Sequence, residues 1–301
     1  MAKIVVIGSC NTDMVVSSPK MPVPGETVMG GEFAIIPGGK GANQAVSAAR
    51  AKGQVSFIAK VGNDDFGRNA IAGYKVDNID ISNIFIDPIK PTGIAVIIVE
   101  ENSGQNSIVV ASGANGNLCV NEIKEVKNII IEADVLLIQL EIPLEVVHYC
   151  LKICNQNGVT TILNPAPAKS LSDEILSFVD IITPNESEIQ ILTGINPNET
   201  SQIKKAVACL LEKVNKAVIL TLGDKGVYFA SKNGDEGFIS TTKVEAIDTT
   251  AAGDVFNGYL ATFVASGKNY RDAIYLANKA AAISVTRKGA QPSIPYIQEI
   301  I

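Results

Sequence analysis

Strand-like and helix-like patterns alternate along most of the chain, and this alternation constrains the fold more than any other feature of the sequence. Short apolar runs, several of them ending in polar or glycine-rich turns, predict a series of strands. These strands are expected at residues 4–7, 55–58, 135–138, 160–163, 181–182, 217–220 and 227–230. Strands that alternate with helices predict an α/β fold of three layers, with a mainly parallel central sheet covered by helices on both faces.

Two stretches interrupt this alternation. Residues 14–36 contain short strand-like pieces separated by prolines and glycines, and residues 92–110 have the apolar pattern of a β-hairpin. We expect the two stretches to pair into one small sheet that projects from the main domain. A lid over a ligand site is a natural role for such a sheet, because closure excludes water. The remaining residues, 1–13, 37–91 and 111–301, are assigned to one discontinuous main domain.

The composition is that of a globular protein. The 301 residues are 47% hydrophobic and 19% charged, close to the ordinary mix, and a chain of this length can bury a large core. No apolar run approaches the roughly 18 residues that a membrane span requires. The apolar part of the N-terminus is too short for a signal peptide. We therefore expect no membrane partner and a cytoplasmic location.

Charge and cysteine content exclude other classes of protein. The net charge is −6 and the basic residues are scattered, so nucleic acid is not an expected partner. The five cysteines include no Cys-x-x-Cys pair and His148 is the single histidine, which disfavours a zinc site and a disulfide framework. We expect reduced cysteines packed as small hydrophobes and a structural role for His148.

The segment 248–254, Asp-Thr-Thr-Ala-Ala-Gly-Asp, places two carboxylates on either side of small residues. Apolar residues recur at helical spacing after it, so a helix is expected to begin near Ala252. The amides of residues 251–253 would face an anion at the positive end of the helix dipole. Asp254, in the first turn, is a candidate general base for a hydroxyl that attacks a phosphoryl group. A carboxylate that only complements the helix dipole explains the pattern equally well.

Residues 37–44, Pro-Gly-Gly-Lys-Gly-Ala-Asn-Gln, form a glycine-rich segment that leads into a helical pattern. Glycines let a backbone approach a ligand closely. Glycine follows Lys40 where a Walker P-loop needs serine or threonine, so a P-loop is rejected. We favour a ligand-binding loop over a turn that only starts a helix, because Lys40 and Asn43 add hydrogen-bond donors.

Polar turns also follow several of the predicted strands. Residues 8–13 form a polar loop after the first strand, where open α/β sheets bind ligands, and they lack the glycine pattern of a Rossmann site. Asn11 and Asp13 there either bind a hydroxylated ligand or form an ordinary turn. The turns expected along the same edge are 139–141, 164–167, 183–188 and 221–226. The turn at 183–188 is equally consistent with an ordinary helix N-cap.

Seven segments in a fixed order resemble the PfkB family of carbohydrate kinases, and in particular its ribokinase branch. They are residues 11–13, 24–27, 38–44, 164–167, 183–186, 248–254 and 286–293. The resemblance spans nearly the whole chain. It implies a ribokinase-like fold and ATP-dependent phosphorylation of the 5-hydroxyl of D-ribose, with Mg²⁺ on the nucleotide and K⁺ as an activator.

The resemblance also implies roles for individual residues. Asp254 would take the proton of the attacking hydroxyl, and the amides of the catalytic segment Ala251, Ala252 and Gly253 would receive the charge of the phosphoryl oxygens. The residues implied for the sugar are Asn11, Thr12, Asp13, Gly39, Lys40, Gly41, Ala42, Asn43, Glu141 and Asp254. Those implied for ATP are Asn185, Thr221, Leu222, Gly223, Asp224, Lys225, Gly226, Gly253 and Asn278. Glu188 would act on Mg²⁺ through water.

A second carboxylate, Asp248, precedes the expected anion site and would repel a phosphate unless a cation offsets it. Arg287 or Lys288 could supply that charge in an ion pair. The resemblance implies instead a K⁺ ion in a cage of oxygen atoms, which are the ligands that hard cations prefer. The cage would be built from Asp248, Thr250, Ser284, Arg287, Gly289 and Ser293.

Some functional alternatives stay open at this point. Family members commonly have histidine where Asn278 stands, so that nucleotide contact would have to be made by an amide. A related kinase for deoxyribose, fructose or a nucleoside is the runner-up function. A sugar-binding regulator without turnover is a third possibility, which the retention of Asp254 disfavours. The family resemblance and the expected sheet edge of the lid both favour a homodimer through the lid.

Overall fold

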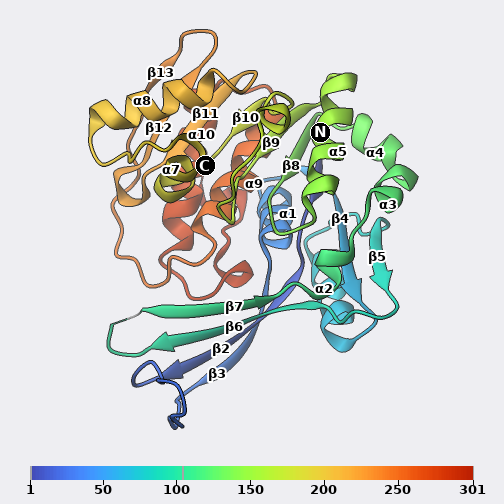
Figure 1. The fold of residues 1–301 in the computed structure, drawn as a ribbon, viewed down its shortest axis with the longest axis vertical. Helices are drawn as coiled ribbons and strands as arrows, with labels where there is room; N and C mark the ends of the chain where they lie inside the picture. The colour runs from blue at the N-terminus through green and yellow to red at the C-terminus, as the bar shows by residue number, and fades with distance from the viewer. Residues whose placement is uncertain (1, 104, 301) are drawn as a thin grey trace.

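The computed structural model describes residues 2–103 and 105–300; residues 1, 104 and 301, which the predicted domains include, lie outside that description. A sheet of nine strands forms the main body, in the order β13-β12-β11-β10-β9-β8-β1-β4-β5 (Figure 1). Its strands are β1 (Lys3–Ile7), β4 (Gln54–Gly62), β5 (Ile84–Asp87), β8 (Val135–Ile138), β9 (Thr160–Leu163), β10 (Ile181–Ile182), β11 (Ala217–Thr221), β12 (Val227–Ser231) and β13 (Glu236–Ile239).

The pairing of these strands confirms the predicted sheet. The strands from β5 to β11 in the sheet order pair in parallel, and β12 and β13 continue the sheet in antiparallel pairs. All seven predicted strands are present, and β8, β9 and β10 have the predicted bounds. The two edge strands, β5 and β13, were not predicted, because each has only four residues and is partly exposed. The apolar run of residues 84–86 was the signal that could have identified β5, whereas β13 has no such run.

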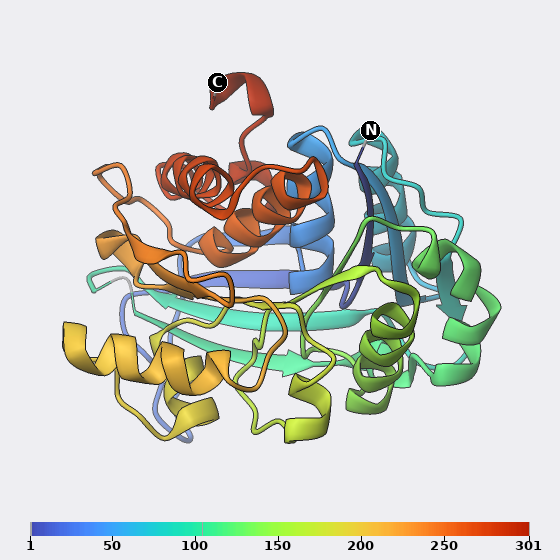
Figure 2. The same cartoon turned by 90° about the horizontal axis from the view of Figure 1, so that it is seen from above.

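Successive residues of each strand face opposite sides of the sheet, so the body has two cores and three layers (Figure 2). In β1, for example, Val6 belongs to one core and Val5 to the other. One face is covered by α1 (Lys40–Arg50), α2 (Asp65–Val76), α9 (Ala252–Ala265) and α10 (Tyr270–Ser284). The other is covered by α3 (Val120–Glu125), α4 (Lys127–Ile131), α5 (Leu144–Asn157), α6 (Asp173–Leu176), α7 (Glu186–Thr193) and α8 (Thr200–Leu211). Short 3₁₀ turns are η1 (Gly113–Asn117), η2 (Gly223–Lys225), η3 (Gln291–Ser293) and η4 (Ile297–Glu299).

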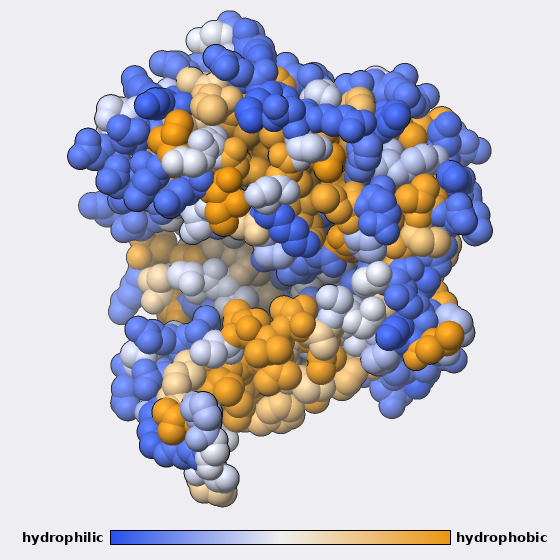
Figure 3. Space-filling view, viewed as in Figure 1, coloured by the Kyte–Doolittle hydropathy of each residue, from blue (hydrophilic) through white to orange (hydrophobic). Residues whose placement is uncertain are grey.

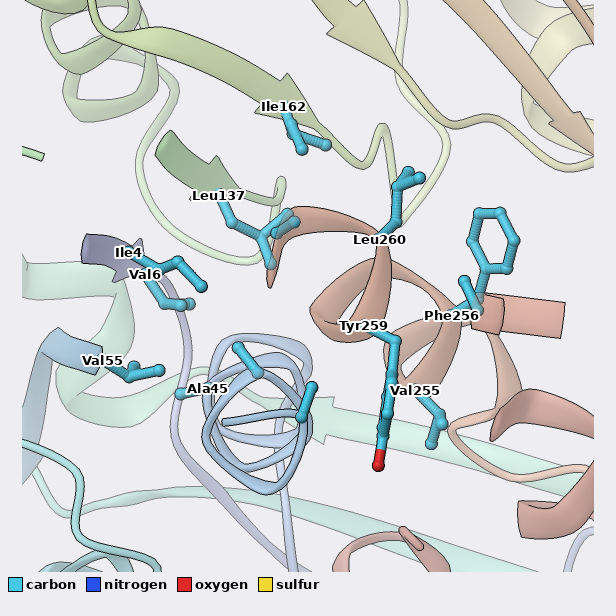
Figure 4. Close-up of a cluster of buried hydrophobic side chains, with 14 of the residues drawn as sticks. Ile4, Val6, Ala45, Val55, Leu137, Ile162, Val255, Phe256, Tyr259 and Leu260 are labelled. Atoms are coloured by element: carbon cyan, nitrogen blue, oxygen red, sulfur yellow. The ribbon is translucent and has the colours of Figure 1, made fainter. Parts of the chain in front are cut away.

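Helices α1 and α9 pack closely against each other and against the sheet (Figure 4). Gly258 of α9 makes this approach possible, because a Cβ atom there would lie 2.5 Å from the Cβ of Ser47 and 2.6 Å from the carbonyl oxygen of Gln44. The Ser47 hydroxyl donates to the carbonyl of Val255 across the same interface at 2.8 Å. The N-terminal turns of the same two helices are joined by hydrogen bonds from Asn43 and Gln44 to Asp254, and the candidate site lies there.

The second sheet has four strands in the order β3-β2-β6-β7 and projects below the body in Figure 1. Its strands are β2 (Asn11–Ser18), β3 (Phe33–Gly38), β6 (Gly93–Glu100) and β7 (Asn106–Ala111). Strands β2 and β6 pair in parallel at its centre, and β3 and β7 flank them in antiparallel pairs. The two stretches that interrupt the strand and helix alternation therefore form one separate small sheet, as predicted. We call it the lid sheet.

The register of the lid sheet gives it two apolar faces. Asp13 is in register with Ile36 and with Ala95, and Ile36 lies against Gly289 of the body, so this row faces the body. The next row faces away from it and is exposed. The exposed apolar residues of this outer face are Phe33, Ile35, Val96 and Val109, with exposed fractions of 61%, 55%, 41% and 71%.

Two predicted loops near the lid are regular structure instead. Residues 11–13 are the first three of β2, so only residues 8–10 connect it to β1. Helix α1 begins at Lys40, directly after Gly39, so residues 40–44 belong to the helix. Both corrections have the same cause. The strands of the lid sheet continue to the edge of the body, where Asn11 pairs with Gly38 and with Gly93, and such pairing is not visible in a local pattern.

The cysteines and the histidine lie largely where the sequence places them. All five cysteines are free; Cys10, Cys150 and Cys154 are buried, whereas Cys119 is exposed. The ring of His148 stacks on Phe178 with centroids 5.8 Å apart, which suits a structural role. Among the described residues, no helix is both long and apolar enough to cross a membrane.

Candidate active site

The carboxylate of Asp254 is held between the N-terminal turns of α9 and α1. Helix α9 begins at Ala252, as predicted, and Asp254 is its third residue, with 6% of its surface exposed. Asn43 Nδ2 donates to Asp254 Oδ2 at 3.0 Å, and Gln44 Nε2 donates to Oδ1 at 2.9 Å. A carboxylate that only complemented a helix dipole would need neither burial nor two side-chain donors.

The surroundings of Asp254 suit a general base. Burial raises its pKa, and the charge of Glu141 raises it further. The positive charge of Lys40 and the hydrogen bonds from Gln44 and Asn43 act in the opposite direction. The pKa remains above that of an ordinary aspartate, and a carboxylate with a raised pKa accepts a proton more readily.

The backbone in front of Asp254 is shaped for close approach. Ala251 has φ 62° and ψ 9°, the left-handed conformation that residues with a Cβ rarely adopt, and such strain clusters at functional sites. A Cβ atom added to Gly253 would meet no heavy atom within 4 Å, so space is open there. The amide of Ala252 donates to the carbonyl of Thr249 at 3.3 Å and would have to leave it to bind an anion.

The lid sheet supplies two of the predicted sugar-binding side chains at the point where it meets α1. Asn11 and Asp13 are 4% and 9% exposed. A Cβ atom on Gly38 would lie 2.2 Å from a carboxylate oxygen of Asp13. Gly38, at the end of β3, therefore makes room for a side chain of the site itself.

Four carboxylates act on the ammonium group of Lys40 through their charges. Burial disfavours the charged form of Lys40, but Asp254, Glu141, Glu188 and Asp13 outweigh it and raise its pKa. Burial and the charges of Glu141 and Asp254 raise the pKa of Asp13 to about 6. One ammonium group against four carboxylates leaves the site negative, so it favours further cations.

Glu141 anchors the start of α1. Its Oε2 accepts hydrogen bonds from the Ser9 hydroxyl at 2.5 Å and from the Lys40 amide at 3.1 Å. Beside it, Asn43 Oδ1 is buried and has no hydrogen-bond partner in the described part of the chain. Such an acceptor is costly when it stays unpaired, and a ligand hydroxyl would satisfy it.

The predicted nucleotide side begins with α7. Asn185 caps this helix, because its Oδ1 accepts from the Glu188 amide at 2.9 Å while Glu188 Oε2 accepts from the Asn185 amide at 2.8 Å. This capping box is the structural alternative that the sequence left open. Glu188 is also 6% exposed, and burial raises its pKa. Its charge interacts with those of Lys40 and Asp254, so it belongs to the same site.

The turn at residues 221–226 lies next to this cap. The Thr221 amide donates to the carbonyl of Pro184 at 2.9 Å, and the Leu222 amide closes the turn onto the carbonyl of Gly226 at 2.8 Å. Asn278, on α10, is 6% exposed, and its Nδ2 lies 3.5 Å from the carbonyl of Ile239. Its amide therefore reaches the edge of the sheet beyond this turn.

Asp248 connects, by hydrogen bonds, the two segments predicted to hold a cation, residues 248–250 and 284–293. Its Oδ1 accepts from the Thr250 amide at 2.9 Å and its Oδ2 from the Gly289 amide at 2.8 Å. Burial alone would raise its pKa, but these hydrogen bonds outweigh burial and lower it. Arg287 pairs with Glu299 and not with Asp248, while Lys288 acts on Asp248 through its charge.

Several hydrogen bonds hold the second of these segments, residues 284–293, in place. Ser284 and Ser293 are fully buried, and each hydroxyl donates to a backbone carbonyl at 2.8 Å, which leaves its oxygen free to accept. Arg50 Nη1 donates to the carbonyls of Gln291 and Ile294 on either side of Ser293, both at 2.8 Å. Carboxylate, carbonyl and hydroxyl oxygens are the donor set that a hard cation takes.

A chain of buried polar side chains behind Asp254 was not assigned from the sequence. From Gln44 Nε2 it runs through Asn164, Thr183 and Asn257 to the carbonyl of Gly253, with hydrogen bonds of 3.0, 3.3, 2.6 and 2.8 Å. Because Gln44 also donates to Asp254, the chain connects the Asp254 carboxylate to the backbone of Gly253 in the first turn of α9. Gln44, Asn164 and Thr183 all lie in segments that carried the family resemblance, but their polar contacts arise only from the tertiary structure.

These residues lie where the lid sheet meets the body. Figure 3 shows a hollow between the lid sheet and the body, with apolar side chains gathered on the lid sheet. The predicted sugar residues Asn11, Asp13, Lys40, Asn43 and Glu141 and the base candidate Asp254 meet there through the contacts and charges described above. Asp248 and Thr250 directly precede the start of α9 in the chain.

The chain is similar to known carbohydrate kinases over nearly its whole length. Residues 1–297 match the model of the pfkB family carbohydrate kinases. The ribokinase of Haemophilus influenzae is 46% identical over 298 residues, which cover 99% of this chain and 97% of that protein. The deoxyribokinase of Salmonella typhi is 35% identical and covers 98% of this chain and 96% of its own. The structure of Arabidopsis thaliana ribokinase complexed with ribose and ATP matches with a TM-score of 0.91 and 31% identity, over 100% of this chain and 98% of that one.

A family model that spans almost all of the chain, together with full-length relatives, extends the resemblance seen in the seven sequence segments to the whole protein. The chain therefore belongs to the pfkB family of carbohydrate kinases.

Proposed function

We propose that this protein transfers the γ-phosphoryl group of ATP to the 5-hydroxyl of D-ribose and releases D-ribose 5-phosphate and ADP. The observation that carries the proposal is the buried carboxylate of Asp254, held by Asn43 and Gln44 beside the open backbone of Gly253. The similarity to ribokinases over the whole chain supplies the identity of the sugar.

In the proposed reaction, Asp254 accepts the proton of the 5-hydroxyl as its oxygen forms a bond to the γ-phosphorus. The bond from phosphorus to the bridging oxygen of ADP breaks. The amides of Ala251, Ala252 and Gly253 receive the charge that the phosphoryl oxygens carry in the transition state. Asn43 and Gln44 orient the carboxylate, and their hydrogen bonds together with the charge of Lys40 favour its ionised form.

The sugar would be held by groups that suit hydroxyls. Asp13 and Glu141 offer carboxylate oxygens, Asn43 offers its unpaired Oδ1, and Lys40 offers an ammonium group. Asn11 adds an amide from the lid sheet. The Gly39, Gly41 and Ala42 backbone at the start of α1 would complete the pocket.

The nucleotide would lie along Asn185, the turn at residues 221–226 and Asn278. Among the described residues, no group of three or more acidic, histidine or cysteine side chains is placed to hold a metal ion directly, which suits an ion that arrives with ATP. Mg²⁺ bound with ATP would offset the charge of the phosphates, and Glu188 would hold it through water.

Turnover with a panel of sugars tests the proposal. ADP release is measured with D-ribose, 2-deoxy-D-ribose, D-fructose and a nucleoside as acceptors. We expect the highest kcat/KM with D-ribose. The similarity to a deoxyribokinase makes 2-deoxy-D-ribose the second candidate, and a preference for it would change the proposed substrate. Sugar binding without turnover would identify a regulator and refute the kinase.

A first prediction concerns a monovalent cation. We propose that K⁺ binds among Asp248, the carbonyl of Thr250 and the loop from Ser284 to Ser293, with Arg287 and Gly289 contributing carbonyls. Because Asp248 already joins the two loops, a cation there would order the amides that precede Asp254. Replacing K⁺ by Na⁺ or a bulky organic cation is expected to lower kcat severalfold.

The controls for the cation site are two substitutions. Asp248→Ala should remove the difference between the salts, whereas Glu299→Gln, which breaks the ion pair with Arg287, should preserve it. Equal kcat of the unmodified enzyme in K⁺ and Na⁺ would rule out the cation site.

A second prediction concerns the lid sheet. We propose that it closes on the sugar, because Asn11 and Asp13 are part of β2. Hydrogen exchange should slow in β2, β3, β6 and β7 together when D-ribose is added. The hairpin of β12 and β13, at the far edge of the main sheet, serves as the internal control. A response in only one half of the lid sheet would contradict closure as a unit.

A third prediction concerns assembly. The outer face of the lid sheet exposes Phe33, Ile35, Val96 and Val109, and contiguous apolar patches of this kind mark interfaces. We propose a homodimer through this face. Val109→Asp should give a monomer in sedimentation experiments, whereas Ile89→Asp, at an apolar residue outside the lid sheet that is even more exposed, should leave the dimer intact. A monomeric unmodified protein would refute the interface.

A further inference from the structure

Asn115 is a buried amide at the root of the lid sheet. It lies in η1, four residues after β7 ends, and only 1% of its surface is exposed. Its Oδ1 accepts from the Cys10 amide at 2.8 Å, and its Nδ2 donates to the Cys10 carbonyl at 3.0 Å and to Asn11 Oδ1 at 2.8 Å. If the amide were reversed, its NH₂ group would face the Cys10 N–H, and its oxygen would face the Cys10 carbonyl and Asn11 Oδ1. The neighbours therefore fix its orientation.

This orientation in turn fixes the amide of Asn11. Because Asn11 Oδ1 already receives a hydrogen bond from Asn115, the Asn11 Nδ2 group must point to the other side. In the part of the chain that the structure describes, we find no protein acceptor for that group. Its two N–H donors are therefore left for an oxygen atom of a ligand, such as a sugar hydroxyl.

We propose that Asn115 is a positioning residue for sugar recognition: it holds Asn11 with its donor side toward the sugar and joins that contact to both ends of the β6–β7 hairpin. The proposal rests on the proposed function, in which Asn11 binds D-ribose.

The connection to the hairpin comes from Gly93 and from η1. Gly93 opens β6 and is in register with Asn11. A Cβ atom on Gly93 would lie 2.3 Å from both Asn11 Oδ1 and Asn115 Nδ2, so the hydrogen bond between the two asparagines passes directly over this glycine. The chain enters the hairpin at Gly93 and reaches Asn115 soon after leaving it. A shift of the hairpin therefore has to move the pair or break its hydrogen bond.

A purely structural role is the alternative, because Asn115 also satisfies the backbone of Cys10. The two roles differ in their consequences. A structural residue affects stability and all substrates alike, whereas a positioning residue acts on the sugar through Asn11. Loss of Asn115 should then matter only while Asn11 is present.

The experiment measures the dissociation constant of D-ribose by calorimetry together with KM for ribose, KM for ATP and kcat. Asn115→Asp keeps the shape but places an oxygen against Asn11 Oδ1. We expect ribose affinity to fall about tenfold or more, with KM for ATP little changed. Asn115→Ala should weaken ribose binding by about two- to tenfold, the range that one hydrogen bond supports. The matched control is Asn117→Ala in the same turn, whose amide bonds Asp87 instead.

A double-substitution cycle completes the test. Asn115→Ala should have no further effect on ribose affinity in a chain that already carries Asn11→Ala. Equal additional losses in both backgrounds, or ribose affinities of the Asn115 variants that match the Asn117→Ala control, would overturn the inference. If Asn115→Asp does not fold, the Asn115→Ala cycle decides. The proposed function fails separately, if the unmodified protein does not phosphorylate ribose.

Discussion

Asp254→Asn is expected to lower kcat by about 10²–10⁴-fold, the usual range for loss of a general base. Asparagine keeps the size of the side chain and one acceptor for the donors of Asn43 and Gln44, so the fold and most of the ribose affinity should remain. Steady-state kinetics and calorimetric titration with D-ribose measure the two quantities separately. A loss confined to KM would mean that Asp254 contributes uniform binding and not catalysis.

The chain offers a matched control for this prediction. Asp272 is the third residue of α10, as Asp254 is the third residue of α9, and it accepts a hydrogen bond from its N-cap, Asn269. If a first-turn acid matters only for the helix dipole, the two substitutions should have similar effects, of about 1 kcal/mol or less on stability. We expect Asp272→Asn to leave kcat unchanged. An unchanged kcat in Asp254→Asn as well would refute the role of Asp254.

Local patterns predicted those features of the fold that depend on neighbouring residues in the sequence. The start of α9 at Ala252 follows from helical spacing after small residues, and the strands β8 to β10 follow from short apolar runs. The pairing of residues 14–36 with 92–110 was also predicted, because both stretches depart from the strand and helix alternation in the same way.

Other features depend on contacts between distant segments. The start of α1 at Lys40 and of β2 at Asn11 is set where the lid sheet meets the body. Asn115 lies more than a hundred residues from the backbone it holds at Cys10. The sequence marks neither, because a buried asparagine looks like any loop asparagine until the fold brings its partners close.

The candidate site also combines features that the sequence predicts with features that arise only from contacts between distant segments. Local patterns marked Asp254, Lys40 and Asn43 as candidates, and the resemblance added a role for Glu141. The structure brings their charges and hydrogen bonds together. Neither the local patterns nor the resemblance explains why the carboxylate of Asp254 stays ionised when it is buried. Three groups in the structure favour the ionised form: the charge of Lys40 and the hydrogen bonds from Gln44 and Asn43, of which Gln44 had been assigned no role.

Gln44→Met is expected to shift the acid limb of the pH dependence of kcat to higher pH. Gln44 donates to Asp254 Oδ1 and lowers its pKa, and a hydrogen bond to a charged group is worth about 1.5–3 kcal/mol. Without it the protonated carboxyl is favoured, and the base takes up a proton at a higher pH. The kcat of the variant should therefore fall most at low pH, about tenfold or more, and recover as the pH rises.

The measurement must separate Asp254 from the other titrating groups that face it. Asp13, with a pKa of about 6, titrates in the free enzyme and affects kcat/KM, whereas kcat at saturating ribose reports the bound complex. Glu141 and Lys40 also act on Asp254 but are the same in both proteins. The difference between the two kcat profiles therefore isolates the hydrogen bond of Gln44.

Gln139→Met is the matched control for Gln44→Met. Gln139 Nε2 donates to Gln44 Oε1 at 2.6 Å, so its loss leaves the bond to Asp254 in place and should move the acid limb less. An equal loss of kcat at every pH would show that Gln44 acts on geometry alone, and a shift to lower pH would contradict the argument outright. A shift to higher pH would mean that the amide chain behind α9 keeps a buried aspartate charged until the sugar hydroxyl gives up its proton.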